Sequence, residues 1–141
     1  MPEDPRKKRK IEHRYVYEWL MTFHPTALQW RRVRLGPLPF KELYPLAKIT
    51  LRWCDAIYIE NNVVHIVEAK LRPDLGAISQ LNHYARLFPE TPEFQAFKDY
   101  PIKKILLIPY PWKDLIEAAK LEGIEVVVWR PAWLKLPAYR R

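Results

Sequence analysis

The residues from 55 to 70, DAIYIENNVVHIVEAK, constrain the fold more than any other part of the sequence. Two runs rich in β-branched and aromatic residues flank Asn61 and Asn62. Asn tolerates the left-handed backbone that a two-residue hairpin turn requires. The pattern therefore predicts an antiparallel hairpin centred on the Asn pair, in which Asp55 and Glu68 stand opposite each other.

This register places two carboxylates at the end of an apolar stripe, with Lys70 one step beyond Glu68 on the same side. At about 5 Å and an effective dielectric constant of ~20, the repulsion between Asp55 and Glu68 is roughly 3 kcal/mol. A divalent cation between them turns that repulsion into binding, and Mg²⁺ prefers oxygen ligands of this kind. The alternative is that Asp55 pairs with Arg52 or Lys70 while Glu68 is solvated, and a one-residue slip in register would also separate the two carboxylates.

Periodicity and turn residues predict the remaining elements. The sequence predicts helices over 11–23, 75–88 and 112–122, and strands over 28–35, 49–60, 63–71, 103–109 and 124–130. A Pro-rich connection fills 36–48, and a loop over 89–101 contains one helical turn at 93–98. The order α-β-β-β-α-β-α-β, with a short-linked final β-α-β unit, predicts an α/β fold: a mixed central sheet flanked by helices.

Basic charge is concentrated at the two ends of the 141-residue chain, whose formal net charge is +8. Residues 1–10 hold five basic and two acidic side chains, and residues 130–141 hold four basic ones and none that is acidic. Basic ends suit a polyanion such as nucleic acid, although a solvated tail is the alternative. We expect 1–10 to be a basic flexible leader, 11–130 the folded domain, and 131–141 a basic extension containing Trp and Pro.

The single cysteine, Cys54, excludes an internal disulfide and any metal site built from several cysteines. This suits a reducing compartment. The sequence has no apolar run of about 18 residues and no secretory signal pattern. We therefore expect an intracellular, cytoplasmic protein with no membrane partner.

An Asp followed after twelve residues by Glu-x-Lys, across a hairpin that lies between two helices, resembles the PD-(D/E)XK nuclease superfamily. The resemblance covers about residues 11–130 and implies a restriction-endonuclease-like αβββαβ core. It implies a metal-dependent DNA endonuclease in which Mg²⁺ or Mn²⁺ is held by Asp55, Glu68 and the backbone carbonyl of Ala69. Lys70 would orient the attacking water and offset charge on the phosphate. The Pro that the family pattern places before the Asp is absent, since Cys54 stands there, but many members lack it.

The resemblance also implies a carboxylate from the first helix. Glu18 fits best because it lies in the apolar half of that helix, and Glu12 is its rival. Gln80 and Tyr84 lie one helical turn apart, in a pattern similar to RecB-like nucleases, where such a pair contacts DNA. Helix packing by Tyr84 beside an incidental Gln is the alternative. His65 falls on the opposite face from the carboxylates, so we interpret it as structural.

Two kinds of nuclease compete. A small basic protein with this motif resembles archaeal-type Holliday junction resolvases, homodimers that act on four-way DNA junctions in recombination and repair, and this is the function we expect. The Gln80 and Tyr84 pair and the long 36–48 connection instead favour a RecB-like exonuclease or single-strand nuclease. A non-catalytic DNA-binding module with the same fold is the second alternative.

The expected partner is branched DNA, together with a second copy of the chain. The cationic side chains expected to hold the DNA backbone are Lys7, Lys8, Arg9, Arg31, Arg32 and Arg34. The apolar residues proposed for a dimer surface lie near the C-terminus and in the connection over 36–47. Those near the C-terminus are Trp129, Trp133, Leu134 and Leu136.

Overall fold

The computed structural model describes residues 4–37 and 52–135. Its elements follow the predicted order. They are α1 (Pro5–Phe23), β1 (Leu28–Leu35), β2 (Arg52–Glu60), β3 (Val63–Ala69), α3 (Gly76–Leu87), the 3₁₀ helices η2 (Phe88–Glu90) and η3 (Pro92–Phe97), β4 (Ile102–Ile108), α4 (Lys113–Leu121) and β5 (Glu125–Val128). Most of the Pro-rich connection lies outside the described residues. None of the described helices combines the length and the apolar character needed to cross a membrane.

The strands form one mixed sheet in the order β1-β2-β3-β4-β5. β1, β2 and β3 are antiparallel neighbours, whereas β3, β4 and β5 are parallel. The predicted hairpin register is confirmed, since Tyr58 pairs with His65 and Glu60 with Val63. Asn61 and Asn62 adopt φ angles of 55° and 61°, the left-handed turn that their residue type permits.

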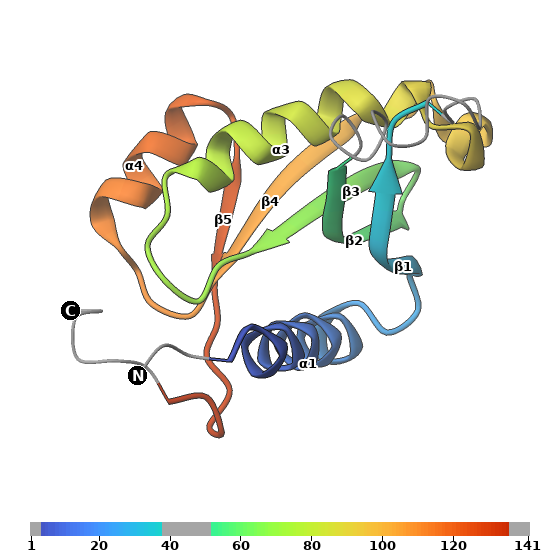
Figure 1. The fold of residues 1–141 in the computed structure, drawn as a ribbon. Helices are drawn as coiled ribbons and strands as arrows, with labels where there is room; N and C mark the ends of the chain where they lie inside the picture. The colour runs from blue at the N-terminus through green and yellow to red at the C-terminus, as the bar shows by residue number, and fades with distance from the viewer. Residues whose placement is uncertain (1–3, 38–51, 136–141) are drawn as a thin grey trace.

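Helices cover both faces of the sheet: α3 and α4 lie on one face and α1 lies on the other (Figure 1). Alternate residues of the hairpin pack in two hydrophobic cores, one on each face of the sheet. Ile57 and Ile66 pack in the core with α3, whereas Tyr58 and Val67 pack in the core with α1. Both faces of β4 are buried towards its end, which explains its continuous apolar sequence.

The first helix begins at Pro5 rather than at residue 11, so the predicted flexible leader is wrong for residues 5–10. Asp4 caps this helix, because its Oδ1 accepts a 2.9 Å hydrogen bond from the backbone N–H of Arg6. Proline is favoured at the first helical position, where its missing N–H costs no hydrogen bond. Asp4 followed by Pro5 is a helix start signal, although the basic run after it dominates the composition of this segment.

The segment after β5 packs along α1 (Figure 1). The hydroxyl of Tyr15 donates a 2.7 Å hydrogen bond to the carbonyl of Trp129, and Leu134 is buried in the α1 core. Trp133 lies under the guanidinium of Arg14, 3.9 Å from the ring centroid. The described residues of the proposed dimer surface therefore cover the chain's own core, and Leu136 lies outside the described residues.

Candidate active site

The predicted trio of Asp55, Glu68 and Lys70 comes together where the β2–β3 pairing ends. The ladder stops at the pair formed by Ala56 and Val67. Beyond it, the backbone N–H of Ala69 donates a 2.7 Å hydrogen bond to Oδ2 of Asp55. Nζ of Lys70 lies 3.4 Å from Oε2 of Glu68. The hairpin thus places two acidic groups and one cation within direct reach of one another.

The two carboxyl groups resist ionisation in the metal-free protein. Burial raises the pKa of Glu68 to about 8, and the charge of Asp55 adds to this rise. Burial also raises the pKa of Asp55, although the hydrogen bond from Ala69 opposes it. A cation shared by the two groups would favour the ionised form of both.

Lys70 remains a cation in this setting. Burial alone lowers its pKa, but the charges of Glu68 and Asp74 more than offset that effect, so that its pKa is raised. Its Nζ lies 3.6 Å from Oδ2 of Asp74. Lys70 can therefore donate hydrogen bonds and offset negative charge, whereas accepting a proton at neutral pH is disfavoured.

Two buried side-chain oxygens in the described part of the chain have no hydrogen-bond partner, Oε1 of Glu68 and Oε1 of Gln80. Leaving such an atom unpaired costs roughly 1–3 kcal/mol, so each needs an explanation. Glu68 is only 6% exposed. An oxygen donor set of this kind fits Mg²⁺ or Mn²⁺. No group of three or more acidic, His or Cys side chains with metal-binding geometry occurs among the described residues.

Glu12 is the carboxylate that α1 brings near the pair. Burial raises the pKa of Glu12 and the charge of Asp55 raises it further, while Lys8 and Lys70 oppose the rise. Glu12 lies one helical turn before Val16, which is buried against the sheet. Extending the apolar stripe of α1 backwards by one turn is the sequence signal that would have identified it.

Glu18 points elsewhere, so the prediction that it completes the site is wrong. Its Oε2 accepts a 2.7 Å hydrogen bond from Nε of Arg14, and its Oε1 accepts one of 2.8 Å from Nε1 of Trp133. These two bonds lower the pKa of Glu18. Glu18 therefore fastens the C-terminal segment to α1 instead of facing Asp55.

Arg32 of β1 stands opposite Asp55 and has a left-handed backbone, with φ of 56°. The β1–β2 pairing runs from Arg31 with Ala56 directly to Val33 with Cys54, which leaves out the intervening position on each strand. Cys54 and Ile57 nevertheless pack in the same core, although residues three apart in a regular strand face opposite sides. Both strands thus break their alternation at one point without losing register.

This paired break turns Asp55 towards α1. Asp55 lines a cavity together with His13 and Val16 of α1, on the face opposite the α3 core. Strict alternation along the strand predicts Asp55 on the same face as Ile57, and the break makes that prediction wrong. The break explains how Asp55 can contact both the Glu68 side and the Glu12 side of the site.

Tyr84 is part of the scaffold of the site. It is buried, and its hydroxyl donates a 2.9 Å hydrogen bond to the carbonyl of Trp53. Burial raises the pKa of Tyr84, and the charge of Glu68 contributes, so this hydroxyl lies near the site. The prediction that Tyr84 contacts DNA is therefore wrong, and the packing alternative holds. Gln80 lies one turn earlier with its buried oxygen unpaired.

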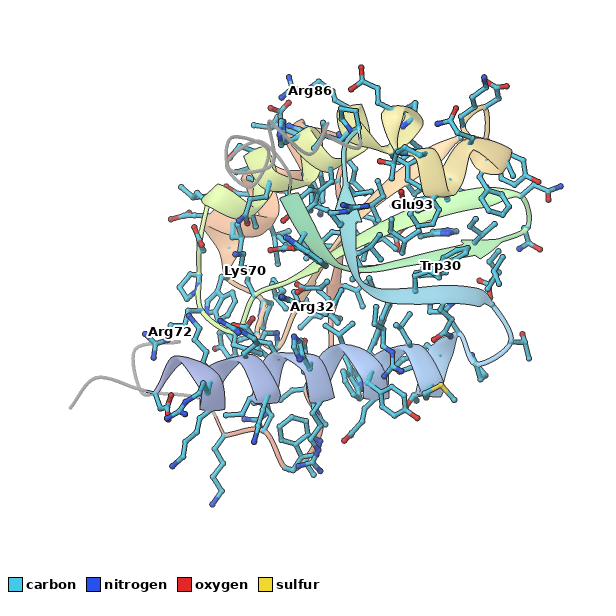
Figure 2. The ribbon with its side chains drawn as sticks, turned by 45° about the vertical axis from the view of Figure 1, so that its right-hand side comes forward. Trp30, Arg32, Lys70, Arg72, Arg86 and Glu93 are labelled. Carbon is cyan, nitrogen blue, oxygen red and sulfur yellow. The ribbon has the colours of Figure 1, made fainter. Side chains whose placement is uncertain are left out.

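The predicted DNA-contacting cations differ in their surroundings. Arg31 and Arg32 are exposed beside the site, and Lys7, Lys8 and Arg9 are exposed on the first turns of α1. Arg34 is instead paired with Glu93, at 3.4 Å. Arg32 and Lys70 both lie above α1 in Figure 2, close to the same part of the helix, whereas Arg86 lies far above them on the α3 side.

His65 lies outside this group. Its ring stacks on that of Tyr58 at 4.2 Å, and Tyr58 belongs to the core on the α1 face. The prediction that His65 lies on the opposite face from the two carboxylates holds for Glu68 and is wrong for Asp55, because the break in β2 turns Asp55 to the α1 face. The stacking on Tyr58 supports a structural role for His65.

Two solved structures resemble this fold. One is the EndoMS–dsDNA2 complex, with a TM-score of 0.53 and 15% identity over 84% of this chain and 44% of that chain. The other is a repair endonuclease from Pyrococcus abyssi, with a TM-score of 0.53 and 14% identity over 93% of this chain and 49% of that chain. This chain thus spans less than half the length of each. No family model and no curated protein matches the sequence.

At these identities the likeness establishes the fold alone. It confirms the predicted fold class, an α/β restriction-endonuclease-like architecture with a mixed five-stranded sheet and flanking helices. The two carboxylates and the lysine that the sequence singled out lie at one point of that fold.

Proposed function

We propose that this chain is a metal-dependent DNA endonuclease that hydrolyses phosphodiester bonds at the site formed by Asp55, Glu68 and Lys70. The observation that carries the proposal is the buried Glu68, whose Oε1 has no partner and whose pKa is raised to about 8 beside a second carboxyl group. A fold that hosts endonucleases gives independent support.

The residues divide into those that would hold the ion and those that position other groups. Asp55 and Glu68 would hold Mg²⁺ or Mn²⁺, with Glu12 and the backbone carbonyl of Ala69 as further oxygen donors. Such an ion polarises a phosphate and lowers the pKa of bound water. The N–H of Ala69 keeps Asp55 oriented. Lys70, which stays protonated, would donate hydrogen bonds to the attacking water or to the phosphate.

The preferred substrate within this proposal is a four-way DNA junction cut by a homodimer. A second candidate is cleavage of duplex DNA in repair, which the two structural neighbours favour, because one is a complex named with dsDNA and the other is a repair endonuclease. The RecB-like reading is weaker, since the side chain of Tyr84 is buried.

Cleavage assays on end-labelled four-way junction, flap, single-stranded and linear duplex DNA, each with Mg²⁺ or with EDTA, test both levels of the proposal. Symmetric nicks in the junction with intact linear duplex would support the resolvase, and duplex cuts would support the second candidate. An Asp55→Asn variant should be inactive on all four. Absence of Mg²⁺-dependent cleavage on every substrate would refute the endonuclease proposal.

A further inference from the structure

We infer that a cavity beside the carboxylate pair binds a DNA phosphate next to the one that is cleaved. The cavity has a volume of about 390 Å³ and lies between α1 and β1. Its lining residues are His13, Val16, Gln29, Arg31, Arg32 and Asp55. The identity of the ligand as DNA rests on the proposed function.

The cavity wall carries two guanidinium groups, Arg31 and Arg32, and one carboxyl group, Asp55. Two arginines of the neighbouring elements pair with acids: Arg14 with Glu18 and Arg34 with Glu93. Arg31 and Arg32 form no such ion pair among the described residues. The guanidinium of Arg31 lies over the ring of Tyr17, 4.4 Å from its centroid, and that of Arg32 lies over the ring of Trp53 at 5.8 Å. Their donors are therefore available to an external anion, and a guanidinium binds phosphate through two parallel hydrogen bonds.

The backbone of Arg32 is what brings both arginines to one cavity. Consecutive residues of a regular strand point to opposite faces, yet Arg31 and Arg32 line the same space. The left-handed φ of Arg32 achieves this, at a cost of roughly 1 kcal/mol for a residue other than glycine. Strain of this kind inside a strand that keeps its register is typical of functional positions.

The position of the cavity indicates which phosphate of a DNA strand would bind there. Asp55 lines the cavity and also belongs to the carboxylate pair, so an anion held by Arg31 and Arg32 would lie beside that pair. A DNA strand supplies such a neighbouring charge on each side of every linkage. Arg32 is thus a positioning residue that fixes the register of the strand over Asp55 and Glu68.

Metal-free binding separates this inference from the proposed function. Duplex affinity is measured by fluorescence anisotropy in EDTA, for the wild type and for Arg32→Asn, since Asn tolerates the left-handed backbone. Arg86→Gln is the control, because it removes one positive charge on α3, far from the cavity. We expect Arg32→Asn to bind DNA about 10-fold more weakly. The slope of log affinity against log salt concentration should fall by the equivalent of about one phosphate contact, while Arg86→Gln changes little.

A duplex series with one uncharged methylphosphonate at successive linkages then locates the contact. One position should weaken the wild type but not Arg32→Asn. The proposed phosphate site is refuted if every position affects both proteins equally, or if Arg32→Asn binds DNA like Arg86→Gln. Either result refutes it even if the protein cleaves DNA. Arg32→Gly, which relieves the backbone strain, repeats the test if the Asn variant does not fold.

Discussion

The backbone N–H of Ala69 donates a 2.7 Å hydrogen bond to Oδ2 of Asp55, at the position where the β2–β3 ladder would otherwise continue. The carboxylate of Asp55 is thus fixed by the strand that carries Glu68. Asn at position 55 can still accept this bond through its amide oxygen but lacks the charge.

Asp55→Asn should therefore fold and lose the metal. We expect Mn²⁺ binding, measured by calorimetry, to weaken by at least about 100-fold and cleavage to disappear, with the melting temperature nearly unchanged. Asp99→Asn, a substitution in the loop before β4, is the matched control and should bind Mn²⁺ like the wild type. Equal Mn²⁺ affinity in Asp55→Asn and wild type would contradict the assignment.

The raised pKa of Glu68 makes the metal-free protein less stable as pH rises. The folded state keeps a proton on Glu68 up to a pKa of about 8, whereas the unfolded state loses it near 4.5. Folded protein binds more protons between these values, so the free energy of unfolding falls with rising pH in this window. Thermal melts in EDTA at several pH values should show a smaller decline for Glu68→Gln than for wild type.

Added Mg²⁺ should counteract this loss, because ion binding requires both carboxylates to be ionised. The rise in melting temperature on adding Mg²⁺ should be greater at pH 8 than at pH 5, and it should be absent in Glu68→Gln. Identical pH profiles for wild type and Glu68→Gln in EDTA would show that Glu68 does not titrate in this window.

Glu12 and Glu18 offer a test of which α1 carboxylate serves the site. Glu12→Gln should lower Mn²⁺ affinity and cleavage by about 10-fold or more, because the group lies within the field of Asp55. Glu18→Ala removes the acceptor of the Trp133 and Arg14 bonds, so it should cost about 1–2 kcal/mol of stability and leave Mn²⁺ affinity unchanged. Weaker Mn²⁺ binding in Glu18→Ala together with unchanged binding in Glu12→Gln would show that Glu18 is the carboxylate that serves the site.

The hairpin could be predicted because residues close together in the sequence determine it. The Asn-Asn turn fixes the register, and the register fixes which residues face Glu68. The rotation of α1 could not be predicted in the same way. It depends on Tyr15 packing under Trp129, a residue far along the chain, and this contact sends Glu18 away from Asp55.

The break at Arg32 and Asp55 also escaped prediction, for a different reason. Glycine or asparagine would have marked a left-handed position, as they do at turns, but arginine gives no such signal. Strict alternation placed Asp55 with Ile57, and only the packing of Cys54 in the same core as Ile57 reveals the change of face. A strand residue held in an unfavourable conformation is a product of tertiary structure.

Gln80 and Tyr84 lie one turn apart on α3 but should respond oppositely to substitution. Tyr84→Phe removes the hydroxyl that donates to Trp53, so it should lower stability by about 1 kcal/mol and leave metal-free DNA affinity unchanged. Gln80→Leu removes a buried oxygen that has no partner, so it should not destabilise the protein. If that oxygen serves the site, the same variant should cleave DNA several-fold more slowly. Denaturant unfolding and single-turnover cleavage measured on both variants check this, and a destabilised Gln80→Leu with normal cleavage would show that Gln80 is a packing residue.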